Sequence, residues 1–108
     1  MTGEPGHAPH ASAPALTGKQ RRRLRGLAHA LEPVVQIGQA GVTEAVVRSV
    51  EQALLAHELI KVRLREPEDK KADSAALAEL AGAALCGLVG HTAILYRPHP
   101  DAPKIALG

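Results

Sequence analysis

The near lack of large aromatic residues is the feature that most constrains the fold of this chain. The 108 residues include no Trp, no Phe and one Tyr, Tyr96, although 45% of them are hydrophobic. A chain of this length forms about one domain with a single apolar core. Leu, Val, Ile and Ala must therefore fill that core. The same composition excludes a nucleic-acid surface built from a row of stacking aromatic rings.

Cysteine content and hydropathy exclude several further classes. Cys86 is the single cysteine and lies in an apolar segment, which excludes an internal disulfide framework and a cluster of thiolate metal ligands. The most apolar window, residues 75–89, is shorter than the roughly 20 residues of a membrane span and contains Glu79. Residues 1–15 lack the basic start and apolar centre of a signal peptide. We expect a cytoplasmic protein without a membrane segment.

Composition changes near both ends of the chain. Residues 1–15 are rich in Ala, Pro, Gly, His and Ser, which offer little surface to bury, and we predict a disordered tail there. Residues 99–108 form a Pro-rich C-terminal extension that ends in an apolar piece, Ile105 to Leu107. This piece either lies against the sheet or stays free. The predicted domain covers residues 16–98.

Three segments have the periodicity of helices. The first begins after Thr17 as its N-cap and ends at Pro33, and the second begins after Thr43. The third covers residues 72–85. The positions predicted to face the core are, helix by helix, Leu24, Leu27, Ala28 and Leu31; Val46, Val50, Ala53 and Leu54; and Leu77, Leu80, Ala81 and Ala84.

Four segments read as strands. "VVQIG" follows Pro33, "ELIKVRLRE" covers residues 58–66, and "CGLVG" and "TAILYRP" are separated at Gly90 and His91. In the second strand Ile60, Val62 and Leu64 alternate with the outward residues Leu59, Lys61, Arg63 and Arg65. The order helix-strand-helix-strand-helix-strand-strand predicts a two-layer α/β sandwich. Its mixed four-stranded sheet should carry the three helices mainly on one side.

Positive charge is concentrated in the first predicted helix. The net charge is only +2, but residues 17–30 carry five cations and no acid: Lys19, Arg21, Arg22, Arg23 and Arg25. Like charges on one helix repel each other, which costs stability unless a bound anion offsets the repulsion. This helix is therefore a candidate site for nucleic acid. A solvated helix face is the alternative. Lys61, Arg63 and Arg65 form a weaker second patch, for which solubility is the simpler explanation.

A glycine pair precedes the second helix, in the unit Gly38-Gln39-Ala40-Gly41. A helix N-terminus presents unpaired N–H groups, and glycines let a sugar-phosphate chain approach without a Cβ clash. Gly-X-X-Gly is a short pattern, and a plain turn is the alternative. The longer phosphate-binding glycine motifs are missing from the sequence, which disfavours a nucleotide-binding enzyme.

No arrangement of residues is typical of an active site. The six histidines have no metal-ligand spacing, and Ser12, Ser49 and Ser74 lie in the tail or on predicted helices. Cys86 is most simply a small core residue. We expect no catalytic residue, no metal, no cofactor and no small-molecule substrate.

Several blocks, taken in order, resemble the bacterial YhbY family, the stand-alone form of the CRM domain (chloroplast RNA splicing and ribosome maturation). They are "L-T-x-K-Q", "G-L-A-H", "P-V-V-x-x-G-x-x-G-V-T", "H-E-L-I-K-V" and "L-Y-R-P", and they run from about Leu16 to Pro98. The resemblance implies an α/β domain similar to the C-terminal domain of bacterial translation initiation factor three. It also implies binding to structured RNA, especially pre-ribosomal large-subunit RNA.

The resemblance further implies which residues would bind. In such domains the glycine loop is compared with that of KH domains, and the basic first helix lies near it. This puts Gly38, Gln39, Ala40 and Gly41 at the RNA backbone, beside the five cations of the first helix. The sequence departs from the family at Gly90-His91-Thr92, where a basic residue is common, and the loop interior Gln39-Ala40 carries no charge.

Together these observations predict a monomeric, non-catalytic RNA-binding protein that assists assembly of the large ribosomal subunit. A second hypothesis is a protein-interaction factor that reaches ribosomal particles through a protein partner. An enzyme acting on RNA has the least support.

Overall fold

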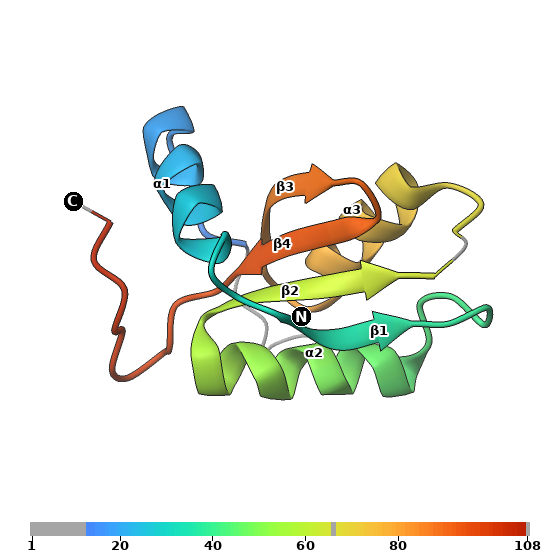
Figure 1. Ribbon diagram of the computed structural model, residues 1–108. Coiled ribbons are helices and arrows are strands. Elements are labelled where there is room, and N and C mark those ends of the chain that lie inside the picture. Colours follow the sequence, from blue (N-terminus) through green and yellow to red (C-terminus); the bar gives the residue numbers. More distant parts are fainter. Residues whose placement is uncertain (1–12, 66, 108) are drawn as a thin grey trace, which may run out of the picture.

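The computed structural model of the protein describes residues 13–65 and 67–107. The elements are α1 (Gly18–Ala28), β1 (Pro33–Ile37), α2 (Glu44–His57), β2 (Leu59–Leu64), α3 (Lys70–Leu80), β3 (Ala84–Val89) and β4 (Thr92–Tyr96). This order, drawn in Figure 1, is the predicted one. Most of the predicted disordered tail, residues 1–12, lies outside the described residues, and residues 13–15 are in neither a helix nor a strand.

The four strands form one mixed sheet in the order β1-β2-β4-β3. β1 and β2 are parallel, with Ile37 opposite Leu64, and the other two pairs are antiparallel. β1 and β3 are therefore the edge strands. The predicted mixed four-stranded sheet is confirmed.

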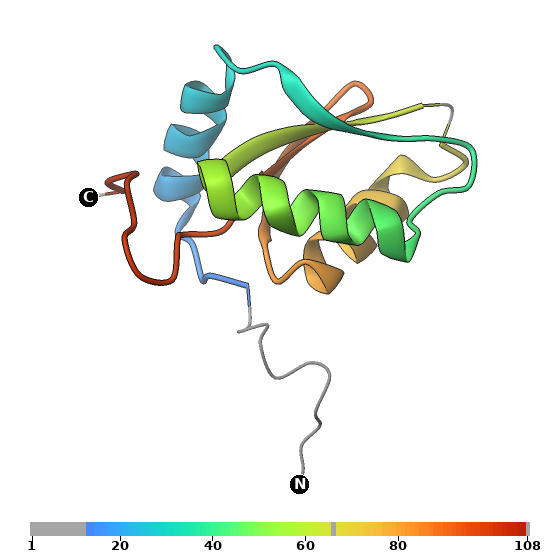
Figure 2. The ribbon, with the colours of Figure 1, turned by 90° about the horizontal axis from the view of Figure 1, so that it is seen from below.

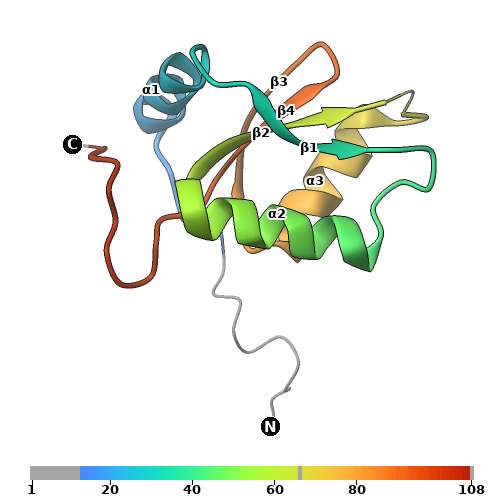
Figure 3. The same ribbon diagram turned by 60° about the horizontal axis from the view of Figure 1, so that its bottom comes forward.

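The alternation of side chains along the strands produces two apolar clusters, one on each face of the sheet. The larger cluster contains Ile60, Val62 and Leu64 of β2 and packs against α2 and α3 through Val50, Leu54 and Leu77. The smaller cluster, which we call the α1 cluster, joins α1 to the opposite face and includes Leu24, Ala28, Leu59, Cys86, Ile94 and Tyr96. Figures 2 and 3 show α2 and α3 together on one side, with α1 at one end of the other. The helices thus lie mainly on one side, as predicted.

All three helices begin with a side-chain cap. The Oγ1 of Thr17 accepts a hydrogen bond from the Gln20 N–H (3.0 Å), and the Gln20 Oε1 accepts one from the Thr17 N–H (3.0 Å). Thr43 caps α2 by accepting from the Val46 N–H (3.2 Å). Asp69 caps α3 in the same way through Ala72. These bonds satisfy N–H groups that a helix leaves unpaired, and the predicted caps Thr17 and Thr43 are confirmed.

Two predicted helix ends are wrong. α1 ends at Ala28 rather than Pro33. After Ala28 the backbone forms a tighter turn, in which the Leu31 N–H donates to the carbonyl three residues back, that of Ala28 (2.9 Å). α3 ends at Leu80 rather than residue 85. Gly82 there adopts a left-handed φ of 66°, and the Ala83 N–H donates to the Ala78 carbonyl (2.8 Å). This is a common glycine helix ending, and it places Ala84 in β3.

The predicted apolar faces are correct except at their margins. Leu27 and Leu80 are 41% and 52% exposed, because α1 contacts the sheet along the narrower stripe of Leu24 and Ala28, and Leu80 is the last residue of α3. Leu59 was predicted to face outward with the basic residues but is 4% exposed. α1 covers this end of the sheet face, a contact that alternation within one strand does not reveal.

The turn between α2 and β2 holds a buried carboxylate that binds the C-terminal extension. Glu58 is 1% exposed, and its carboxylate accepts hydrogen bonds from the N–H groups of His99 (2.6 Å), Lys104 (2.9 Å) and Ile105 (3.0 Å). Burial works to raise the pKa of Glu58, but these N–H bonds outweigh it, so the pKa lies below its ordinary value of 4.5. Ile105 and Leu107 pack against the α1 cluster. The extension therefore does not stay free.

We predict that Glu58→Gln lowers the free energy of unfolding by about 2 kcal/mol at neutral pH, because an amide replaces a charged acceptor of three backbone N–H groups. The folded-state pKa of Glu58 is depressed, so its contribution is present above the unfolded pKa and is lost as pH falls through the folded one. Urea unfolding of both proteins at several pH values should show their difference shrinking below about pH 4.5. Glu79→Gln, at an exposed position of α3, is the matched control. A difference independent of pH would contradict this role of the carboxylate.

Candidate nucleic-acid interface

Three of the five cations of α1 are bound to backbone carbonyl groups. Arg21 and Arg25 donate through Nη1 to the carbonyl oxygens of Leu85 and Cys86 in β3, at 2.9 Å for Arg25. Arg23 donates through Nε to the carbonyl oxygen of Ala106 in the extension (3.0 Å). These bonds offset part of the repulsion among the cations of α1. The repulsion is therefore weaker evidence for a bound anion than the sequence suggested. These arginines hold α1 in place.

Lys19 and Arg22 are the cations of α1 that remain available to a ligand. Both are exposed, and within residues 13–65 and 67–107 neither donates a hydrogen bond to the protein. Arg25 uses one nitrogen of its guanidinium for Cys86, so part of its donor capacity also remains. Some cations of α1 therefore stabilise the fold, and the others remain exposed to solvent.

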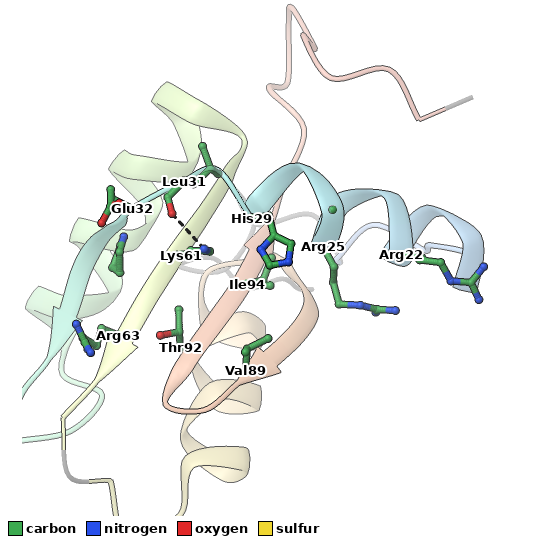
Figure 4. A pocket seen from close by; sticks show the side chains of 12 residues that line it. Arg22, Arg25, His29, Leu31, Glu32, Lys61, Arg63, Val89, Thr92 and Ile94 are labelled. Atoms are coloured by element: carbon green, nitrogen blue, oxygen red, sulfur yellow. Dashed lines mark hydrogen bonds between the residues drawn. The ribbon is translucent and has the colours of Figure 1, made fainter.

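An open groove of about 710 Å³ lies between α1 and the part of the sheet face that α1 leaves uncovered. We call it the α1 groove. Figure 4 shows Arg25 and His29 on the α1 side, Lys61 and Arg63 on the β2 side, and Ile94 between them. The lining residues are Arg22, Arg25, Gly26, His29, Leu31, Glu32, Pro33, Lys61, Arg63, Val89, Thr92 and Ile94. Two basic patches that are separate in the sequence therefore face one groove.

The cations of the second patch differ in their surroundings. The Lys61 Nζ donates to the carbonyl oxygen of Leu31 (3.1 Å), which holds this ammonium beside the loop that follows α1. Arg63 is exposed on β2. Arg65 follows the end of β2, and its N–H donates to the Ile37 carbonyl (2.9 Å). Arg65 therefore lies next to the glycine loop and outside the α1 groove.

The glycine loop and α1 are at opposite ends of β1, as Figures 1 and 2 show. The expected closeness of the loop and the basic helix is wrong, because α1 leads into the amino end of β1 while the loop leaves its carboxyl end. The β3–β4 turn lies at the loop's end of the sheet, since the Leu64 N–H donates to the His91 carbonyl (2.8 Å). Arg65 and His91 are thus basic residues at the loop's end of the sheet.

The two glycines of the loop differ in what the fold requires. Gly41 has a φ of 78°, which disfavours other residues, and its N–H donates to the Gly38 carbonyl (3.0 Å). Gly38 needs no such conformation, and a Cβ there would meet nothing within 4 Å. Glu44 adds an acid to the first turn of α2. The backbone conformation thus accounts for a glycine at position 41. At position 38 the conformation does not require glycine, and the missing side chain leaves the loop backbone open to a ligand.

Several residues of the α1 groove were missed by sequence reasoning, chiefly His29, Val89 and Thr92. The pattern of β4 could have pointed to Thr92, because Thr92 and Ile94 occupy alternate positions and share a face. His29 had no such signal. It enters the groove because α1 ends at Ala28 and His29 follows directly.

A metal-ligand cluster and a membrane-spanning helix are both absent from the part of the chain that the structure describes. No group of three His, Cys, Asp or Glu side chains that could hold a metal is found there. In the same residues no helix is long and apolar enough to cross a membrane. Burial raises the pKa of the Cys86 thiol, while Arg21 and Arg25 act in the opposite direction. Cys86 is a core residue, as expected.

The fold and the α1 groove define a small mixed α/β domain with a concave basic surface. The chain belongs to the CRS1/YhbY (CRM) domain family, whose model matches residues 16–97. A Haemophilus influenzae protein named as an RNA-binding protein is 44% identical over 94 residues, which cover 85% of this chain and 94% of that protein. A Bacillus subtilis protein named as a probable RNA-binding protein is 38% identical and is covered to 98%. The solution structure of a hypothetical Staphylococcus aureus protein, proposed there to bind RNA, is similar with a TM-score of 0.76. It is 35% identical, and the match covers 87% of this chain and all of that one.

We predict that the cations of α1 separate into two groups by their effect on stability. Arg21→Ala should lower the free energy of unfolding by about 1 kcal/mol, because it removes a charge-assisted hydrogen bond to β3. Arg22→Ala, one residue away and exposed, should change it by less than about 0.5 kcal/mol. Urea unfolding at one ionic strength measures both, and equal losses would show that charge alone, rather than the bond to Leu85, matters.

Proposed function

We propose that this protein is a non-catalytic RNA-binding protein that acts as a monomer in the cytoplasm and assists assembly of the large ribosomal subunit. The observation that carries the proposal is the meeting of Arg22 and Arg25 with Lys61 and Arg63 across the α1 groove. The relatives named as RNA-binding proteins support the choice of RNA as the ligand. The ribosomal target rests on the family resemblance of the sequence.

The mechanism follows from the arrangement of the charges. Cations on both sides of the α1 groove neutralise phosphates, and β2 extends the positive charge from Lys61 to Arg65 over about 13 Å. At the far end the open Gly38 backbone allows close approach of the RNA chain. Phosphate contacts position a protein without reading sequence. We therefore propose recognition of RNA shape and backbone rather than base sequence.

A salt titration tests the electrostatic part of the proposal. Replacing Lys19, Arg22 and Arg63 together by Gln should flatten the dependence of log affinity on log salt by about 2 to 3 units, at about 0.7 to 0.9 units per lost phosphate contact. Fluorescence anisotropy with a fragment of large-subunit RNA gives the slopes. Arg48→Gln, an exposed cation on α2 across the sheet, is the control and should leave the slope unchanged. Equal slopes in all proteins, or binding to ribosomal particles but not to naked RNA, would instead support a protein-mediated contact.

The glycine loop has a separate test. Gly38→Ala should leave the free energy of unfolding within about 0.5 kcal/mol, since nothing in the fold opposes a Cβ there. The added methyl group should weaken RNA binding about tenfold, or about 1.4 kcal/mol, if the RNA backbone touches this loop. Gly18→Ala, with equally open surroundings at the start of α1, is the matched control for binding. Unchanged affinity of Gly38→Ala would remove the loop from the interface.

A further inference from the structure

We propose that the α1 groove holds one unpaired nucleotide of the bound RNA, with its base on the groove floor and its flanking phosphates on the cations of the two sides. This inference rests on the proposed function and adds which part of an RNA enters which part of the protein. It differs from recognition of a duplex backbone, because an unpaired base must be present.

The size of the α1 groove fits a ligand of this kind. Its volume of about 710 Å³ lies within the range of sites that hold small molecules, about 300–1,000 Å³. A paired base in a helix has both faces covered by its neighbours and cannot lie on an apolar floor. Bases in loops and bulges are unstacked and can be turned outward. The groove therefore accepts an unpaired base and excludes a paired one.

The floor of the α1 groove is apolar, while its sides are charged. Val89 of β3 is 66% exposed and supplies most of this aliphatic surface, while Ile94 of β4 lines the groove from beneath and is itself largely buried. Gly26 leaves open space on the α1 side, since a Cβ there would meet nothing within 4 Å. Charge lies around this surface, on Arg22, Arg25, Lys61 and Arg63. A phosphate by itself gains nothing from an apolar floor. A nucleotide has both parts, an apolar base face and charged phosphates on either side.

His29 and Arg25 can supply the stacking surface of the α1 groove, which no Phe, Tyr or Trp ring lines. Tyr96 is buried in the α1 cluster and does not line the α1 groove. Imidazole rings and guanidinium planes both stack on bases. Arg25 is held by its hydrogen bond to Cys86, and Gly87 makes room for the Arg25 side chain, since a Cβ there would lie 2.7 Å from its Cδ. Figure 4 shows His29 and Arg25 side by side on the same side of the groove.

Glu32 is the acid among the lining residues, and it also favours a nucleotide over a plain polyanion. Its carboxylate repels phosphate but accepts hydrogen bonds from a ribose 2′-hydroxyl or a base amino group. Phosphates should therefore lie at Arg22, Arg25 and Arg63, and the sugar or base edge should lie toward Glu32.

The test compares two RNA duplexes of about 20 base pairs, identical except for one bulged nucleotide, in anisotropy titrations with the full chain. The wild type should bind the bulged duplex about tenfold more tightly. Gly26→Leu, which fills the groove from an open position on α1, and His29→Ala should both reduce this preference to about one. The readout is the ratio of the two affinities, so a loss of binding that is equal for both duplexes leaves it unchanged. Ser49→Leu and His57→Ala, both at exposed positions of α2, are matched controls and should keep the preference.

A 4-thiouridine placed at the bulge gives a direct readout. It should crosslink to residues of the α1 groove, and mass spectrometry would locate the site. Salt-dependent binding of both duplexes with no bulge preference, or a preference that Gly26→Leu leaves intact, overturns this inference and leaves the proposed function standing. If neither RNA binds, the proposed function itself is overturned.

Discussion

The contact between α1 and the sheet is the interaction on which the other features of this protein depend. Leu24 and Ala28 bury the inner stripe of α1 against the smaller apolar cluster, and Arg21 and Arg25 bind the carbonyl groups of β3. The α1 groove exists because the helix stands on one end of the sheet face and leaves the rest open. Any change that released α1 would remove one side of the groove together with its cations.

Glu58 supports this contact from a distance. Its carboxylate binds the backbone of the C-terminal extension, which then packs Ile105 and Leu107 against the α1 cluster. A buried carboxylate is tolerated here because backbone N–H groups satisfy it. The extension lies beyond the family match at residues 16–97, so this chain stabilises a shared domain with residues outside the matched segment.

The arginines of α1 serve both folding and surface charge. Those that face β3 donate to carbonyl groups of an edge strand, and covering such an edge also hinders pairing with another chain. Arg22 lies between Arg21 and Arg23 in the sequence but has no protein partner within the described residues, because the helical turn directs it elsewhere. A run of charge in a sequence is therefore a poor guide to how much of that charge is free.

Local sequence patterns predicted most of the helices and strands, but they did not predict which residues come together in the α1 groove. Thr17 and Thr43 marked their helix starts, and the alternation of Ile60, Val62 and Leu64 identified the core face of β2. The helix ending at Gly82 was missed because an alanine-rich segment continues on both sides of it. Leu27 and Leu80 were misplaced because periodicity gives the direction of an apolar face but not its width.

The sequence by itself determined the element order, the aliphatic core, the positions of the charges and the family resemblance, since each depends on residues close together in the chain. The tertiary structure alone decided that α1 covers Leu59 and that Arg25 and Lys61 line the same groove. It also decided that the glycine loop lies at the other end of β1 from α1. These outcomes depend on strand order and on which face of the sheet a helix covers. Both are set by contacts between distant segments, which no local pattern records.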